Sequence, residues 1–140
     1  MADTVTSQTI QDGNKTAVLK FTNESDGTGE ASVKKVDVSA LAADSQGNAC
    51  TSVSIARIYW ACRGMGVDIE FDASTNVLAI PLPADSTGDE YYDLFGSIPN
   101  NAGSGVTGDI DFTTVSASNG DAYSIIPVSY THLTLPTKVE

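Results

Sequence analysis

Apolar and polar residues alternate along much of this chain, and a period of two residues indicates β-strands with one buried face. In the segment VDIEF, Val67, Ile69 and Phe71 fall on one face, with two acidic residues between them on the other. The segment TAVLKFTN alternates in the same way over residues 16–23. We therefore expect both segments to be strands that direct apolar side chains toward a core.

Turn-forming residues connect some of these strands. The segment DASTN separates VDIEF from VLAIPL, which predicts a hairpin over residues 66–82. In DIDFTTVSASNGDAYSII, Asn119 and Gly120 are residue types that adopt the positive φ angles of a tight turn, which predicts a second hairpin over residues 109–126. The segment SVSIARIYWAC has apolar residues on both faces, which predicts a central strand covered on two sides.

The spacing of strands and loops predicts the fold class. Helix signals are limited to single turns in VSALAADSQGN and DEYYDLFG, and loops rich in glycine and serine separate the strands. About six to eight short strands with such loops are typical of an all-β fold, either an antiparallel β-sandwich or a jelly-roll-like domain. We expect a single β-domain over residues 1–127.

The charge of the chain restricts the classes of partner that it can bind. It has 18 acidic and 7 basic residues, a net charge of −11, which repels nucleic acid and anionic membrane surfaces. No apolar run is long enough to span a bilayer, and the start MADTVTSQTI lacks the basic and apolar regions of a signal peptide. We expect synthesis and folding in a cytoplasm, with neither nucleic acid nor membrane as a partner.

Two cysteines, Cys50 and Cys62, frame the apolar segment that predicts a central strand. If the residues between them form one extended strand, the two sulfurs lie roughly 40 Å apart. A disulfide requires Cα atoms within about 7 Å of each other. We therefore expect two buried, unpaired thiols, as suits a reducing compartment.

Two motifs resemble ligand-binding loops but lack the required context. The segment GSGVTG at residues 103–108 has the G-x-G-x-x-G spacing, yet no helix signal follows it, as a dinucleotide site requires. The segment DASTN places oxygen donors at alternate positions, but Val77 and Pro83 stand where a calcium loop needs glycine and glutamate. Neither motif predicts a cofactor or metal site.

Paired acids are the remaining candidates for chemistry. Asp109 and Asp111 alternate with apolar residues, so we expect both carboxylates to point outward into solvent. No arrangement of nucleophile, base and orienting group is visible in the sequence. The sequence predicts no catalytic residue, no cofactor and no metal ligand, and therefore a protein that is not an enzyme.

The aromatic residues are candidates for contacts with a partner. Tyr91 and Tyr92 lie in an acidic segment, and Phe95 follows them; aromatic residues are enriched in protein interfaces, so these three are the predicted interface contacts. Trp60 lies within an apolar run and is predicted to be a core residue. A sugar-binding platform built from Trp60, or from Tyr91 and Tyr92, is the alternative.

We expect a different origin for the last residues of the chain. Read in one frame, an adapter used in transposase-based sequencing libraries translates to Val-Ser-Tyr-Thr-His-Leu-Thr-Leu-Pro-Thr, which is identical to residues 128–137. We interpret residues 128–140 as a non-native, adapter-derived tail, with the biological sequence interrupted near Ile126. His132, the single histidine of the sequence, then has no function, and the tail is expected to dock weakly.

Several phrases of the sequence resemble small structural proteins of marine tailed bacteriophages. They are MADTVTSQTIQDG, VLKFTNESDGTGEASVKKVDVSAL, QGNACTSVSI and NNAGSGVTGDIDFTT…NGDAYSII, which together span most of residues 1–126. The resemblance implies a virion location, and it carries no functional residues with it.

From these observations we expect a capsid decoration or auxiliary head protein that binds the assembled shell. Its partners would be the major capsid protein or other virion proteins, and the chain would form a homo-oligomer. Two alternatives stay open: a component associated with the tail or its fibres, and a carbohydrate-binding β-domain.

Overall fold

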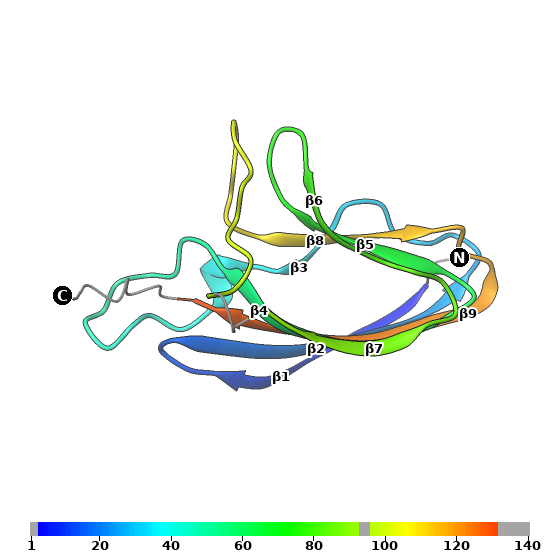
Figure 1. Ribbon diagram of the computed structural model, residues 1–140, viewed down its shortest axis with the longest axis horizontal. Helices are drawn as coiled ribbons and strands as arrows, with labels where there is room; N and C mark the ends of the chain where they lie inside the picture. The colour runs from blue at the N-terminus through cyan, green and yellow to red at the C-terminus, as the bar shows by residue number, and fades with distance from the viewer. Residues whose placement is uncertain (1–2, 93–95, 132–140) are drawn as a thin grey trace.

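The computed structural model describes residues 3–92 and 96–131 and consists of two antiparallel β-sheets packed face to face (Figure 1). One sheet has five strands in the order β1-β2-β9-β4-β7, and the other has four in the order β3-β8-β5-β6. The described residues contain no α-helix. The predicted all-β sandwich is therefore confirmed.

The elements, in chain order, are β1 (Thr4–Asp12), β2 (Thr16–Asp26), β3 (Val33–Val36), the 3-10 helix η1 (Val38–Ala40), β4 (Ser54–Arg63), β5 (Gly66–Phe71), β6 (Val77–Leu82), β7 (Thr87–Tyr91), β8 (Ile110–Val115) and β9 (Asn119–Tyr130).

The aromatic centre of the core joins the two sheets. Phe112 on β8 packs edge-on against Phe21 on β2 and Tyr123 on β9, with ring centroids 5.5 and 5.8 Å apart. The Tyr123 hydroxyl donates a 2.6 Å hydrogen bond to Glu30, whose other carboxylate oxygen lies 2.5 Å from the Lys35 ammonium. Both members of that ion pair are buried, so each compensates the desolvation of the other.

The predicted hairpin over residues 66–82 is confirmed. Strands β5 and β6 pair antiparallel, with Val67 opposite Leu82 and Phe71 opposite Val77. The apolar side chains predicted to point inward from β5 are fully buried.

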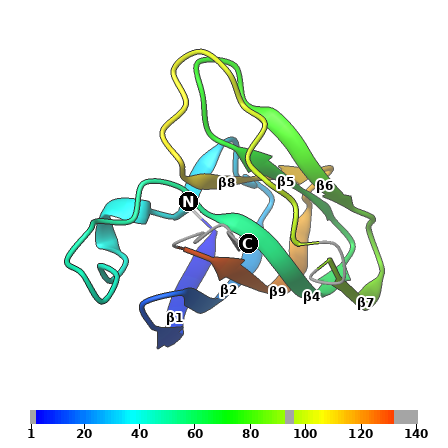
Figure 2. The ribbon, with the colours of Figure 1, turned by 60° about the vertical axis from the view of Figure 1, so that its left-hand side comes forward.

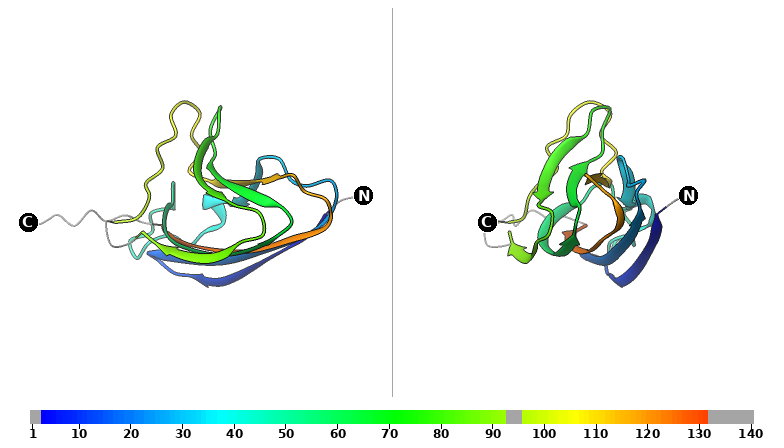
Figure 3. Two further views of the ribbon diagram at one scale, coloured as in Figure 1. Left: turned by 45° about the vertical axis from the view of Figure 1, so that its right-hand side comes forward. Right: turned by 90° about the vertical axis from the view of Figure 1, so that its right-hand side faces the viewer.

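The predicted hairpin over residues 109–126 is wrong. Strand β8 pairs with β3 and β5, whereas β9 pairs with β2 and β4 in the opposite sheet. After β8 the chain crosses from the four-stranded sheet to the five-stranded sheet. Figures 2 and 3 show the two sheets in other orientations. Because β8 and β9 lie in opposite sheets, their inner faces meet, and Phe112 packs against Tyr123. Strands paired side by side in one sheet would not face each other in this way.

Strand β4 contains an irregularity that changes which side chains point inward. Its register against β9 shifts between Ile55 and Arg57, as in a β-bulge. Ile55 is buried before the shift, and Ile58 and Cys62 are buried after it, so the inward set moves from odd to even numbers. The expectation that β4 is covered on both faces therefore holds at the start of the strand, where Ser54, Ile55 and Ala56 are all buried, but not at its end, where Ala61 and Arg63 are exposed.

The two thiols have the predicted state. Cys50 and Cys62 are both free and buried, and burial raises the pKa of Cys62 to about 11. Cys50 lies before β4, which begins at Ser54. The expectation that one extended strand joins the two cysteines is therefore wrong.

Strand β9 continues past Pro127 into the segment interpreted as adapter-derived. Val128 pairs with both β2 and β4, and Tyr130 does the same. Ser129 and Thr131 point inward and are buried. The expectation of weak docking is therefore wrong for residues 128–131, while the adapter origin itself stays a prediction, because backbone pairing does not depend on origin. His132 lies outside the described residues.

Gly108 allows the loop before β8 to contact the segment before β4. Its φ is +90°, and a Cβ atom there would lie 1.9 Å from the Thr51 carbonyl oxygen. We predict that Gly108→Ala lowers the free energy of unfolding by about 2–4 kcal/mol, because backbone strain and a backbone clash add.

The matched control is Gly47→Ala. Gly47 has a similar φ of +86°, but no atom lies within 4 Å of the position that a methyl group would occupy, so this variant isolates backbone strain, about 1 kcal/mol. Urea unfolding of the two variants and the parent measures both losses. Equal losses would show that the close approach at Gly108 does not exist.

Candidate functional site

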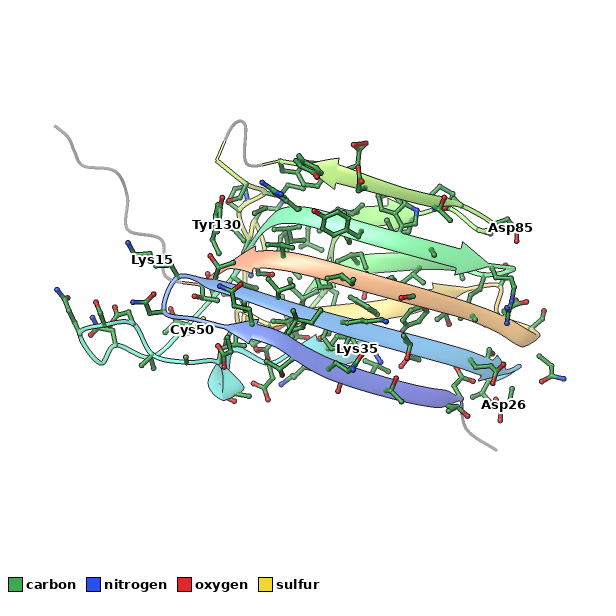
Figure 4. The ribbon with its side chains drawn as sticks, turned by 90° about the horizontal axis from the view of Figure 1, so that it is seen from below. Lys15, Asp26, Lys35, Cys50, Asp85 and Tyr130 are labelled. Carbon is green, nitrogen blue, oxygen red and sulfur yellow. The ribbon has the colours of Figure 1, made fainter. Side chains whose placement is uncertain are left out.

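The five-stranded sheet has one face packed on the core and one face that no other described element covers (Figure 4). We call this uncovered side the outer face. Strand alternation places its side chains: in β9, Ile126 and Val128 point outward between the buried Ile125, Pro127 and Ser129.

Cross-strand neighbours group apolar and aromatic side chains on the outer face. Val18 of β2 is opposite Val128 of β9, Val128 is opposite Arg57 of β4, and Arg57 is opposite Tyr91 of β7. In the next row, Tyr59 lies between Ile126 and Asp89. The outer face therefore has a patch made of Val18, Arg57, Tyr59, Tyr91, Ile126 and Val128.

Three residues at one edge of this patch contact each other closely. The rings of Tyr59 and Tyr91 have centroids 6.3 Å apart at 75°, and their hydroxyl oxygens lie 3.5 Å apart. The Arg57 guanidinium carbon lies 4.3 Å from the Tyr91 ring centroid, a cation–π contact. The Tyr91 hydroxyl and Arg57 lower the pKa of Tyr59, because both stabilise its phenolate.

The three predicted interface residues have different locations. Tyr91 is 45% exposed and belongs to the patch. Tyr92 is partly buried against the core, and its amide donates a 2.7 Å hydrogen bond to the Ala56 carbonyl. Phe95 lies outside the described residues.

Sequence reasoning missed Arg57 and Tyr59. Without the bulge, simple alternation puts them on the same face as Ile55, which is fully buried. The one signal in the sequence is a shift in the apolar positions, from odd numbers at Val53 and Ile55 to even numbers from Ile58 onward.

Trp60 is partly buried against the core, in agreement with its predicted role. Gly88 is opposite it on β7, and a Cβ atom on Gly88 would lie 2.8 Å from the indole ring. The indole nitrogen donates a 3.0 Å hydrogen bond to Ser86. The missing side chain at residue 88 therefore provides space for the indole at the sheet edge.

The expectation that Asp109 and Asp111 point into solvent is wrong, since each is 3% exposed. Asp109 lies 2.9 Å from the Lys34 ammonium and accepts a hydrogen bond from the Val38 amide. Both aspartates do point away from the core, but loops that pack over the four-stranded sheet cover them. Periodicity within a strand gives no information on such loops.

Asp111 forms a carboxyl pair with Asp72. One Asp111 oxygen accepts a 3.0 Å hydrogen bond from Asn76, and Asp72 accepts one of 2.7 Å from Thr107. Burial and the neighbouring Asp72 raise the pKa of Asp111 to about 6, whereas hydrogen bonds from Thr107 and Asp111 lower the pKa of Asp72. Below a pH of about 6, the protonated Asp111 can therefore donate a hydrogen bond to Asp72.

Among residues 3–92 and 96–131, no three His, Cys, Asp or Glu side chains are grouped in a way that could hold a metal ion. In the same part of the chain, no helix has the length and apolar character needed to cross a membrane. No protein-family model matches the chain, and no curated protein matches it.

We predict that the fold loses stability as pH rises from about 4 to about 6, because the folded state holds the Asp111 proton more tightly than the unfolded state, with its pKa of 3.8. A shift from 3.8 to about 6 corresponds to at most about 3 kcal/mol. Asp72, with a lowered pKa, acts in the opposite sense but below this window.

Asp111→Asn keeps the shape and removes the titration. This variant should be more stable than the parent at pH 7 and should lack the decline between pH 4 and 6, as measured by urea unfolding at several pH values. Asp89→Asn is the control, since Asp89 is exposed on β7 of the other sheet and lies outside the carboxyl pair. A parent protein whose stability is flat or rises through this window would contradict the carboxyl pair.

Proposed function

We propose that this chain is a non-enzymatic structural protein of a tailed-phage virion that binds the assembled head shell through the outer face. The observation that carries the proposal is the contact group of Arg57, Tyr59 and Tyr91 on a sheet face that no described element covers. Tyrosine and arginine are the residue types that dominate binding energy at protein interfaces.

The composition of the face supports a protein partner. Val18, Ile126 and Val128 provide an apolar centre beside the tyrosines, and Asp89 lies at its border. An apolar centre with a polar rim is the usual anatomy of an interface. The partner would be the major capsid protein or another virion protein, and the net charge of −11 would keep densely displayed copies from clumping.

The resemblance to phage structural proteins supports a virion location. The chain would be made in the host bacterial cytoplasm and incorporated into the virion. A tail-associated or fibre-associated position would use the same face, so the experiment must separate heads from tails.

The carbohydrate-binding alternative has less support. Sugars stack on flat aromatic platforms, whereas the rings of Tyr59 and Tyr91 stand at 75° to each other. Trp60 packs inward and donates its indole N–H to Ser86. Tyr91 is the one aromatic of the patch that is largely open to a ligand.

We predict that the chain co-purifies with heads and not with tails when the two are separated from the parent phage and analysed by mass spectrometry. We also predict that Tyr91→Ala weakens binding of the purified chain to heads stripped of it by about tenfold or more, as expected for an aromatic interface anchor. Cosedimentation measures that binding.

The matched control is Leu78→Ala, because Leu78 is 51% exposed but lies on β6 of the opposite sheet. This control should bind as the parent does. Detection in tails alone would assign the protein to the tail, and equal binding by the two variants would exclude the outer face as the docking surface.

A further inference from the structure

Strand β1 is exposed along its whole length. All nine of its residues are exposed, including Val5 at 42% and Ile10 at 58%. It pairs with β2 on one side, and no described strand pairs with its other side, where it forms the edge of the five-stranded sheet (Figure 4). The backbone N–H and C=O groups on that side are available for a further strand.

The edge at β1 lacks the usual protection against strand pairing. Residues 4–11, TVTSQTIQ, contain no charge and no proline, in a chain with a net charge of −11. Edge strands are normally protected by charges, proline, short length or bulges. Of these devices β1 has one, a register shift between Thr9 and Gln11.

The opposite edge of the same sheet is protected. Strand β7 has only five residues, and it carries Asp89 and Glu90. Two copies of β7 would bring four carboxylates together, whereas two copies of β1 would bring two, those of Asp12 at its end, and the uncharged residues 4–11 would pair with each other. Charge and length therefore both favour β1 as the edge on which a second copy of this acidic chain can pair.

We propose that β1 pairs antiparallel with β1 of a second copy across a two-fold axis, joining two five-stranded sheets into one continuous sheet. This contact is isologous, so it closes as a dimer and exposes no further copy of the same edge. Pairing of β1 with β7 of another copy is the competing arrangement, and it would instead produce rings or filaments.

The dimer has a geometric consequence for the outer face. The two-fold axis of an antiparallel strand pair is perpendicular to the sheet, so both outer faces point to the same side. If the outer face also binds a partner as proposed above, the dimer binds it bivalently. The strand pairing itself does not depend on that function.

The test is the molar mass of the full chain, measured by sedimentation equilibrium over a wide range of concentration. We expect a monomer–dimer equilibrium, with a dimer mass twice the 14.6 kDa of one chain. The double variant Thr6→Glu with Gln8→Glu would place carboxylates opposite one another in the pairing that sets Thr6 of one copy against Gln8 of the other. The dimer dissociation constant should rise by about tenfold, and added salt should restore part of the affinity.

The matched control carries the same two added charges on other exposed edges, through Thr87→Glu on β7 and Leu78→Glu on β6. It should dimerise as the parent does, and circular dichroism should show that both variants retain the fold. A parent that is monomeric at every concentration would overturn the proposal. So would a dimer unaffected by the β1 charges, or assemblies larger than a dimer that the control variant disrupts.

Discussion

Phe112 packs edge-on against Phe21 and Tyr123, which come from neighbouring strands of the opposite sheet. This contact requires β9 to be held in place, because β9 supplies Tyr123 and also Ile125, which is fully buried. Strand β9 is paired on both sides, with β2 and with β4. The same alternation that directs these two residues inward directs Ile126 and Val128 outward, so one strand contributes to both the core and the outer face.

The unequal width of the two sheets explains which surfaces are left open. Five strands pack on four, and β1 at the edge is exposed at every position. The outward side of the four-stranded sheet differs, because the loop before β8 covers it: the Thr107 hydroxyl bonds to Asp72, and Asp111 is buried beneath. Asp72, Asp109 and Asp111 on that side are thus bonded within the molecule, whereas the outer face and β1 keep exposed apolar and aromatic side chains such as Tyr91 and Ile10.

Local patterns predicted the parts of the fold that depend on local interactions. The β5–β6 hairpin follows from alternation and a turn between neighbouring strands, and the buried thiols follow from their apolar surroundings. The arch between β8 and β9 depends on which sheet each strand joins, and no residue near Gly120 encodes that choice. The burial of Asp111 depends on Asn76, which bonds to it from a distant part of the chain. It also depends on the loop that contains Thr107, which bonds to Asp72.

Of the contact group Arg57, Tyr59 and Tyr91, Tyr91 alone was predicted from the sequence. Tyr91 is in the patch because it lies opposite Arg57 on β4, whereas Tyr92 follows the strand and packs against the core. Arg57 and Tyr59 reach the outer face because a single bulge in β4 changes the inward set. A bulge has no reliable signature in one sequence, so alternation alone assigned them to the wrong face.

The end of β9 shows how far pairing can proceed without apolar side chains. Its inward positions change from Tyr123 and Ile125 to Ser129, and the next inward residue, Thr131, is buried with an Oγ1 atom that has no hydrogen-bond partner among the described residues. Backbone pairing with β2 and β4 continues regardless. An adapter-derived segment that alternates and contains β-branched residues would behave in this way.

The most direct test of the central role of β9 is amide hydrogen exchange of the full chain, resolved by residue. If β9 is one central strand, the amides of Val128, Ser129 and Tyr130 exchange as slowly as those of Ile125 and Ile126, because all of them open only when the sheet unfolds. Exchange at residues 128–130 that is orders of magnitude faster than at Ile125 would show that the strand ends at Pro127, and would contradict this account.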